Sequence, residues 1–450
     1  MRVSMIGTGY VGLVTGVGLA ELGHHVVCVD SDQEKIDTIR RGEVPFFEPG
    51  LEPLLQRTLG ERLDATTDLR RAVLETELSL IAVGTPSRDD GAIDLSSVEA
   101  VARQVGEALR DKAAYHVVVV KSTVVPGTTE DVVLPLLEQT TGKRAGPDFG
   151  LGMNPEFLTE GEAVQDFLFP DRLVLGAIDE RTHQTLDALY AGLPRVERMR
   201  TTPRTAEMIK YASNALLATL ISFSNEVGNL CAALGKEEGG VDVAEVMQGL
   251  HLSKYLRHSL PDGSAITAPL AAFLWPGCGF GGSCLPKDVK AIIARGRRAG
   301  VPMPLLDAVI GINERQPRQI LTLLHRHYPS LQGVRVAVLG LAFRPDTNDM
   351  RESPAIPIIH DLLAQGAELT AYDPAANAEA RRLFGNGRLR VCDDLPEAVR
   401  DVDAVVLVTR WDEFRRLPEL LRRGERQPVV IDGRRMLDKA SVPRYEGIGL

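Results

Sequence analysis

The first thirty residues constrain the fold more than any other segment. Arg2–Ile6 reads as a short apolar strand, and it runs directly into Gly7-Thr8-Gly9-Tyr10-Val11-Gly12. The apolar residues of Leu13–Leu22 then recur at helical spacing, and a second strand, His25–Val29, ends in Asp30. Glycines at such a strand-to-helix turn permit a tight bend and a close approach of the backbone to a ligand. This order of elements predicts an α/β protein with a parallel sheet.

The same turn predicts a bound dinucleotide. A pyrophosphate is favoured at a helix N-terminus, where backbone amides point outward. Asp30 falls about 20 residues further on, where a carboxylate accepts hydrogen bonds from the ribose hydroxyls. Because a carboxylate at this place would repel a 2′-phosphate, the sequence favours NAD over NADP as the cofactor.

Length and composition limit the number of domains and the kinds of partner that this chain can have. A chain of 450 residues is long enough for two or three domains, and a net charge of −10 gives no reason to expect nucleic acid or an anionic membrane as a partner. Five cysteines, an odd number, read as reduced thiols in a cytoplasmic protein. Residues 3–20 are apolar behind Arg2 and resemble a signal segment, but the glycine pattern explains them better. No His/Cys spacing indicates a metal site.

Strands and helices alternate up to about residue 195. Leu78–Val83 ends in Gly84-Thr85-Pro86, and Val117–Val120 ends in Lys121-Ser122-Thr123. The carboxyl ends of parallel strands are where open α/β sheets bind ligands, so Thr85 and Thr123 are candidates for contact with the cofactor. The alternative is that both threonines only cap turns or helices.

Long helical segments follow between about residues 200 and 310. Thr205–Leu234 holds no proline and predicts one long helix that links two domains and packs against a second copy of the chain, giving a homodimer. Lys210 and Asn214 lie one turn apart on it. Such a pair is either solvated surface or a source of donors for a developing oxyanion.

A second α/β unit begins near Leu331. Val334–Gly340 repeats the character of the first strand, and further strands are expected at Glu368–Tyr372, Ala404–Thr409 and Val429–Ile431. We therefore expect two Rossmann-like doubly wound domains joined by a long central helix and a helical dimerisation region, divided as 1–197, 198–312 and 313–450. The polar run from Arg344 to Ser353 suits the phosphates and sugar of a nucleotide.

One segment unites three chemical groups: Gly279-Phe280-Gly281-Gly282-Ser283-Cys284-Leu285-Pro286-Lys287-Asp288. If Pro286 opens a helix, Cys284 lies at its positive end and Asp288 one turn along. That setting lowers the pKa of a thiol and makes a nucleophile. The alternative is a small buried cysteine beside an ordinary helix start.

Taken together, these residues resemble the UDP-glucose/GDP-mannose dehydrogenase family, with the UDP-glucose branch the nearest match. The resemblance covers nearly the whole chain in order and is carried by GTGYVG with Asp30, EPGL at 48–51, GTP at 84–86, KSTV at 121–124, NPEFLTEG at 154–161, KYASN at 210–214, GFGGSCLPKD at 279–288 and FRPDTNDMRESP at 343–354.

The resemblance implies an NAD-dependent oxidation of a nucleotide-sugar C6 alcohol to a carboxylate in two hydride transfers, through a thioester on Cys284. It implies further catalytic residues, namely Lys210, Asn214, Asp288, Glu160 and Thr123. The residues it implies for NAD are Gly7, Gly9, Tyr10, Val11, Gly12, Asp30, Lys35, Thr85, Thr123, Glu160 and Lys287. Those implied for the substrate are Glu156, Phe157, Leu158, Lys210, Asn214, Phe280, Gly281, Phe343, Arg344 and Arg351.

Three features depart from the family's pattern, and alternatives remain for the substrate, for the function and for the two glutamates. Residues 251–275 replace the family's usual shorter link, whose arginine reaches substrate; Arg257 is considered as a stand-in but is not counted among the site residues. Arg344 stands where lysine is common, and Cys278 is a second thiol, expected to pack. GDP-mannose and N-acetylated UDP-hexoses are alternative substrates. A two-electron hydroxyacid-type dehydrogenase and a non-catalytic nucleotide-sugar sensor are alternative functions. For Glu156 and Glu160 the alternative is a solvated helix face.

Overall fold

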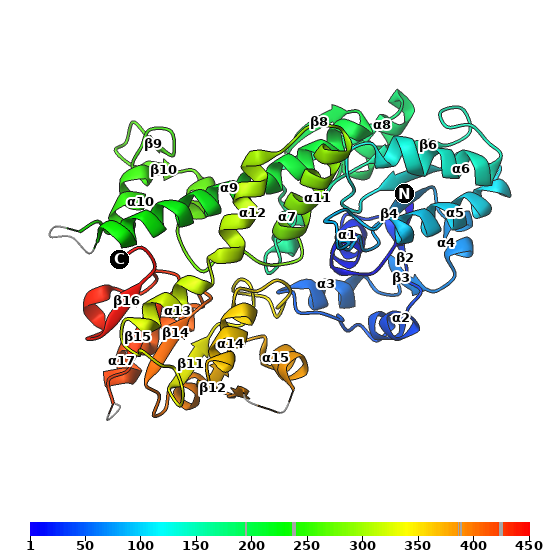
Figure 1. Ribbon diagram of the computed structural model, residues 1–450. Helices are drawn as coiled ribbons and strands as arrows, with labels where there is room; N and C mark the ends of the chain where they lie inside the picture. Colours follow the sequence, from blue (N-terminus) through cyan, green and yellow to red (C-terminus); the bar gives the residue numbers. More distant parts are fainter. Residues whose placement is uncertain (194–195, 236–239, 386, 388, 423–425) are drawn as a thin grey trace. The chain divides into compact units, whose positions relative to one another are not determined.

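The computed structural model describes residues 1–193, 196–235, 240–385, 387, 389–422 and 426–450. The chain divides into two compact units, which we call the N-terminal unit (1–213 with 294–300) and the C-terminal unit (214–293 with 301–450). Each unit is built around its own parallel sheet, as expected for an α/β protein. The long helix α9 (Pro203–Leu234) and helix α11 (Leu285–Arg298) each cross the boundary between the units (Figure 1).

The sheet of the N-terminal unit has the strand order β3-β2-β1-β4-β5-β6-β7-β8. The pairs are parallel except β6 with β7. The strands are β1 Arg2–Ile6, β2 His25–Val29, β3 Leu63–Thr66, β4 Leu78–Ile81, β5 Val117–Val120, β6 Gly150–Met153, β7 Arg172–Ala177 and β8 Glu197–Thr201. The helices are α1 Tyr10–Glu21, α2 Gln33–Arg40, α3 Leu51–Thr58, α4 Leu69–Glu75, α5 Ser96–Arg110, the π-helix η1 Thr129–Val133, α6 Leu134–Thr141, α7 Ala163–Leu168 and α8 Glu180–Leu189.

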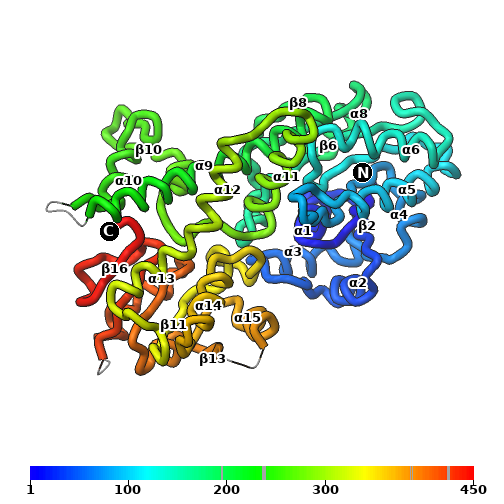
Figure 2. The backbone as a smooth tube through the Cα atoms, viewed as in Figure 1, coloured from blue at the N-terminus to red at the C-terminus, as the bar shows by residue number. Residues whose placement is uncertain are grey.

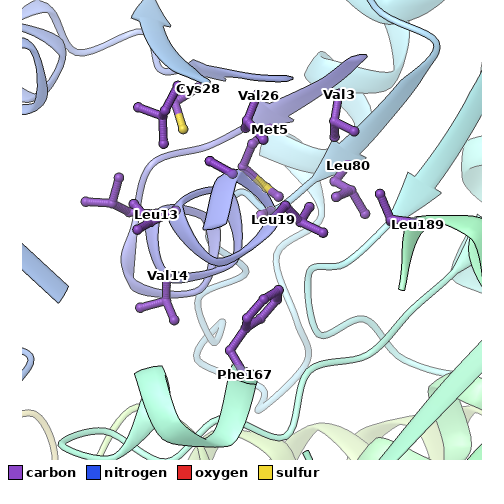
Figure 3. Packing of buried hydrophobic residues seen from close by; sticks show 14 of the residues in the cluster. Val3, Met5, Leu13, Val14, Leu19, Val26, Cys28, Leu80, Phe167 and Leu189 are labelled. Atoms are coloured by element: carbon purple, nitrogen blue, oxygen red, sulfur yellow. The ribbon is translucent and has the colours of Figure 1, made fainter. Parts of the chain in front are cut away.

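Helix α1 is buried on nearly all sides, which explains its continuous apolar sequence. Residues 12–20 of this helix are all buried. Figure 3 shows Leu13 and Leu19 of α1 among strand residues such as Val26 and Cys28, with Phe167 of α7 beside the same helix. The helix is therefore held in a fixed position after strand β1, and its first turn is fixed with it.

The sheet of the C-terminal unit has the order β13-β12-β11-β14-β15-β16, all parallel. Its strands run from yellow to red in Figure 2 and are β11 Arg335–Leu339, β12 Glu368–Tyr372, β13 Leu389–Val391, β14 Ala404–Leu407, β15 Val429–Asp432 and β16 Tyr445–Gly447. Its helices are α14 Ala355–Ala364, α15 Asn377–Phe384, α16 Leu395–Ala398, η3 Asp412–Arg416, α17 Leu417–Arg422 and η4 Lys439–Ser441. The reversal of strand order at β11 is that of a Rossmann-like sheet, which confirms the predicted fold class.

The segment between the sheets is mostly helical. Besides α9 and α11 it contains α10 Val243–His251, η2 Pro269–Phe273, α12 Pro304–Arg315 and α13 Arg318–His325. The atypical 251–275 segment forms the short hairpin of β9 Arg257–Ser259 and β10 Ala265–Thr267. Arg257, the substitute considered for the family's arginine, is exposed on this hairpin. Among the described residues no helix combines the length and apolar character needed to cross a bilayer.

Candidate active site

The glycine turn has the geometry that a dinucleotide requires. Gly7 adopts a φ of +99°, which side chains disfavour, and a Cβ on Gly12 would lie 1.8 Å from the Gly7 carbonyl oxygen. Gly9 is the N-cap of α1, and no described atom lies within 4 Å of where its Cβ would be. The turn is closed on its inner side and open at the helix N-terminus, so it fits a pyrophosphate.

Asp30 lies beside this turn at the end of β2. Its carboxylate accepts hydrogen bonds from the backbone amide and hydroxyl of Thr8, both at 2.8 Å, and from the amide of Asp32 at 3.1 Å. Burial acts to raise the pKa of Asp30, but these donors and Lys35, at 3.9 Å, hold it below its usual value. Asp30 is thus an ionised acceptor at the place expected for a ribose.

Thr85 and Thr123 lie together at the carboxyl edge of the sheet. The hydroxyl of Thr85 donates to the carbonyl oxygen of Thr123 at 2.9 Å. Nearby in the chain, Ser122 donates to the carbonyl oxygen of Val83 at 2.7 Å. These bonds tie the loops after β4 and β5 to each other.

Glu156 and Lys210 form a buried ion pair in the N-terminal unit. Lys210 Nζ lies 2.9 Å from Glu156 Oε1, and both side chains are about 5–6% exposed. Burial acts to raise the pKa of Glu156, but Lys210 and the amide of Leu158, which donates at 2.6 Å, keep it low. Lys210 is therefore not solvated surface.

The residues 156–160 are not helical, so the alternative of a solvated helix face for Glu156 and Glu160 is wrong. The segment is a loop after β6 that is fixed by side chains from elsewhere. The guanidinium of Arg172 lies 4.0 Å from the ring centre of Phe157. Phe157, Leu158 and Glu160 are each half-buried in this loop.

In the C-terminal unit, Cys284 stands immediately before α11, as the proline at position 286 predicts. Cys284 is half-buried, whereas Cys28, Cys231, Cys278 and Cys392 are buried. Burial raises the pKa of Cys28 to about 12 and that of Cys278 to about 11. Cys278 packs in the core of this unit, as expected for the second thiol.

Asp288 lies one turn into α11, where its amide donates to the Cys284 carbonyl oxygen at 2.9 Å. Its own carboxylate is 1% exposed. Asn214 Nδ2 donates to it at 2.6 Å, and Lys287 Nζ donates at 2.6 Å. Asn214 of α9 and the α11 residues Asp288 and Lys287 thus form one hydrogen-bonded group.

The glycine-rich segment before Cys284 lies against the polar run of residues 343–353. The amide of Gly282 donates to the carbonyl oxygen of Arg351 at 2.8 Å. A Cβ on Gly281 would lie 2.3 Å from the Glu352 carbonyl oxygen, so only glycine permits this contact. Besides Asn214, the C-terminal unit holds five residues expected to contact substrate: Phe280, Gly281, Phe343, Arg344 and Arg351. Arg351 is itself exposed and paired with Asp349 at 2.7 Å.

Family models match the chain over nearly its whole length. Residues 1–194 match the NAD binding domain, residues 204–315 the central domain and residues 337–439 the UDP binding domain of the UDP-glucose/GDP-mannose dehydrogenase family. The chain belongs to this family. It is therefore an NAD-dependent nucleotide-sugar 6-dehydrogenase, and its open turn at Gly9 fits the cofactor.

Relatives named for two different substrates have similar sequence identity to this chain. The chain is 43% identical to a UDP-glucose 6-dehydrogenase of Haloferax volcanii over the full length of both. It is 40% identical to a GDP-mannose 6-dehydrogenase of Pseudomonas aeruginosa, covering 90% of this chain and 89% of that one. A solved UDP-glucose dehydrogenase of Pyrobaculum islandicum superposes with a TM-score of 0.89 at 40% identity, covering 99% and 97% of the two chains.

Three buried polar residues have structural positions for which the sequence predicted no role, namely Glu48 and Lys121, which lie in the EPGL and KSTV motifs, and Glu207. Glu48 accepts from the amides of Gly161 and Ala163 at 2.8 and 2.9 Å. Glu207 accepts from the amides of Gly127 and Thr129 at 2.6 and 2.8 Å, and from the Thr129 hydroxyl at 2.7 Å. Lys121 donates to Asn154 Oδ1 at 3.0 Å. No local signal in the sequence marks Glu207, whose neighbours one turn away include the charged residues Arg204 and Lys210. Within the described part of the chain, no group of three or more potential ligands is placed to hold a metal ion.

Proposed function

We propose that this chain oxidises UDP-glucose to UDP-glucuronate in a four-electron reaction in which Cys284 is the nucleophile. The observation that carries the proposal is the placement of Cys284, the half-buried cysteine, directly before α11 with Asp288 one turn along. A helix N-terminus favours an anion, and a thiolate is the form of cysteine that attacks a carbonyl carbon.

The chemistry explains why a thiol is useful. Bound NAD accepts a hydride in each of two oxidations, and an aldehyde has no good hydride to give until a nucleophile has added. Cys284 Sγ forms a bond to the aldehyde carbon, whose oxygen becomes an oxyanion. After the second oxidation the carbon is held as a thioester. Water then attacks this carbon, the C–S bond breaks, and the carboxylate and the thiol are released.

The buried polar side chains supply the accompanying proton and charge chemistry. We assign the acceptance of a proton from the attacking water to Asp288, with Asn214 orienting its carboxylate at 2.6 Å. Lys210 donates to the oxyanion, Glu160 serves as acid and base for the alcohol, and Thr123 helps to hold the water. The sugar nucleotide is contacted by Glu156, Phe157, Leu158, Phe280, Gly281, Phe343, Arg344 and Arg351, while Lys35, Thr85 and Lys287 contact the cofactor.

UDP-glucose is the first choice because residues 337–439 match a UDP binding domain and a relative 43% identical over its full length is a UDP-glucose 6-dehydrogenase. A panel of sugar nucleotides tests this, with NADH followed by absorbance. We expect UDP-glucose to give two NADH per sugar, and Cys284→Ser to abolish uronate formation while NAD binding is kept. One NADH per sugar, or normal uronate formation by the variant, would contradict the mechanism. Preferential turnover of GDP-mannose would correct the substrate alone.

We also propose that the protein is a homodimer. Leu216, Phe223 and Leu230 are spaced seven residues apart on α9, and they are 51%, 46% and 59% exposed. A stripe of large apolar side chains along one helix face is typical of a surface covered by a partner. Analytical ultracentrifugation tests this, and Phe223→Glu is expected to yield monomer. A wild-type chain that sediments as a monomer would refute it.

A further inference from the structure

Lys121, at the end of β5, is a buried lysine that the mechanism above does not use. Its side chain is 5% exposed. Its Nζ donates to Asn154 Oδ1 at 3.0 Å and lies 3.5 Å from the Asn154 carbonyl oxygen. Among the described residues, the oxygens that lie within 3.5 Å of this ammonium as acceptors are thus both neutral. Because lysines are rarely buried unless they are paired, this ammonium needs an explanation.

The amide that holds Lys121 is itself fixed. Asn154 Nδ2 donates to the carbonyl oxygen of Val174 at 3.0 Å, and Oδ1 also accepts from the Tyr190 hydroxyl at 2.6 Å. Since the nitrogen of Asn154 is engaged with a carbonyl, its oxygen must face Lys121. The position of the ammonium is therefore set by a rigid network of neutral groups rather than by a carboxylate.

Two charged groups act on Lys121 from other elements of the same unit. Burial lowers the pKa of Lys121 to about 8; Glu156, in the loop after β6, acts to raise it, and Lys210, on α9, acts to lower it further. Lys121 in turn helps to keep the pKa of Glu156 low. Two ammonium groups therefore share the field of one buried carboxylate.

We propose that Lys121 is a positioning residue for the reaction, acting through Glu156 to hold the Glu156–Lys210 pair in its charged, productive arrangement. This inference rests on the proposed function, in which Lys210 donates to the oxyanion. If Glu156 faced Lys210 alone, the carboxylate would offset most of the lysine's charge. With Lys121 sharing the carboxylate, more of the Lys210 field is left for the reacting oxygen.

The proposal has a pH signature. Lys121 donates to Asn154, and the charges of Glu156 and Lys210 act on it; the Tyr190 hydroxyl shares the Asn154 oxygen, and burial raises the pKa of Tyr190. Lys121 is charged below a pKa of about 8 and loses its charge as the pH rises through that value. We therefore expect kcat to fall along an alkaline limb near pH 8.

The test compares full-length wild type, Lys121→Met and the control Lys143→Met, with UDP-glucose and NAD over pH 6.5–9.5. Lys143 is a suitable control because it also donates to backbone carbonyls in this unit, at 2.6 Å to Leu109. We expect Lys121→Met to lower kcat about 10-fold or more, less than loss of a direct donor, with KM for the sugar little changed and the limb near pH 8 gone. Lys143→Met is expected to keep the wild-type profile.

A second variant keeps the test decisive if Lys121→Met does not fold. Asn154→Asp places a carboxylate against the ammonium, so the limb is expected to move to higher pH. A folded Lys121→Met with wild-type kcat and pH profile would overturn the inference, as would an unmoved limb in folded Asn154→Asp. A wild type that turns over no sugar nucleotide would instead refute the proposed function.

Discussion

Gly9 separates the stability of the glycine turn from its capacity to bind NAD. Its backbone, with φ −68° and ψ −172°, suits any residue, and no described atom lies within 4 Å of an added Cβ. Gly9→Ala therefore adds a methyl group that the protein itself accommodates, at the place where the pyrophosphate of NAD is expected. The variant should fold normally and bind NAD weakly.

Two opposed effects determine how Gly9→Ala changes the free energy of unfolding. Replacing glycine restricts the unfolded chain and stabilises the protein by about 0.4–1 kcal/mol. Alanine is a poorer N-cap than glycine, which costs a few tenths to about 1 kcal/mol. The free energy of unfolding should thus change by less than about 1 kcal/mol. A methyl group forced into a packed contact costs about 1–3 kcal/mol, so NAD should bind about 5- to 150-fold more weakly.

The assay pairs calorimetric titration of NAD with urea unfolding. Gly249→Ala is a matched control, because Gly249 also has no described atom within 4 Å of its Cβ and lies inside α10. That control should gain up to about 1 kcal/mol of stability and keep its NAD affinity. Gly9→Ala with wild-type stability and wild-type NAD affinity would refute the placement of the pyrophosphate at this helix end.

Three further substitutions test the site. Asp30→Ala should weaken NAD about 10-fold relative to NADP, through loss of a charged acceptor, and an unchanged ratio of the two dissociation constants would remove the ribose assignment. Lys210→Ala should lower kcat about 10²–10³-fold, whereas a loss confined to KM would make it a binding residue. Burial raises the pKa of Glu207 to about 7, so the folded protein binds this proton more tightly than the unfolded chain and loses stability as pH rises from about 4.5 to 7. Glu207→Gln should abolish this pH dependence of the free energy of unfolding and lower that free energy by about 1–3 kcal/mol in urea unfolding, because an amide cannot accept from all the donors of loop 127–129. Glu107→Gln, at an exposed position, is the control. An unchanged pH dependence in Glu207→Gln would contradict the assignment of the slope to Glu207.

Local patterns in the sequence were enough for the sheet and the turn. At the N-terminus, a strand, a glycine turn and a helix follow one another within about twenty residues, and each is determined by its own local sequence. The proline two residues after Cys284 likewise determines the start of a helix there. The predicted strands are found either with the predicted ends, as for Arg2–Ile6 and His25–Val29, or with ends shifted by one or two residues. The long helix begins at Pro203 rather than Thr205. Proline suits a first helical position because its missing amide has no partner there in any case.

Contacts between distant residues could not be predicted in the same way. Lys210 and Glu156 are far apart in the chain, and nothing local distinguishes this buried pair from solvated charges. The same holds for Asn214 with Asp288 and for Glu207 with the 127–129 loop. Each pairing depends on how α9 packs, which the sequence pattern predicts only as a helix with an apolar face. The resemblance to the family predicted which residues belong to the site, and the structure shows which side chains they contact.

The two Rossmann-like sheets show why a shared fold does not give a shared ligand. In the C-terminal unit Gly340, with φ +88°, follows β11 as Gly7 follows β1, and Asp373 follows β12 as Asp30 follows β2. There, however, Asp373 accepts from the amides of Leu341 and Ala342 at 2.7 and 3.0 Å and from the Trp411 indole at 3.1 Å. Its carboxylate is fully buried, so it occupies the amides that would otherwise face a phosphate. The partly exposed Asp30 and open Gly9 leave the first turn available, and this difference confines the dinucleotide to the N-terminal unit.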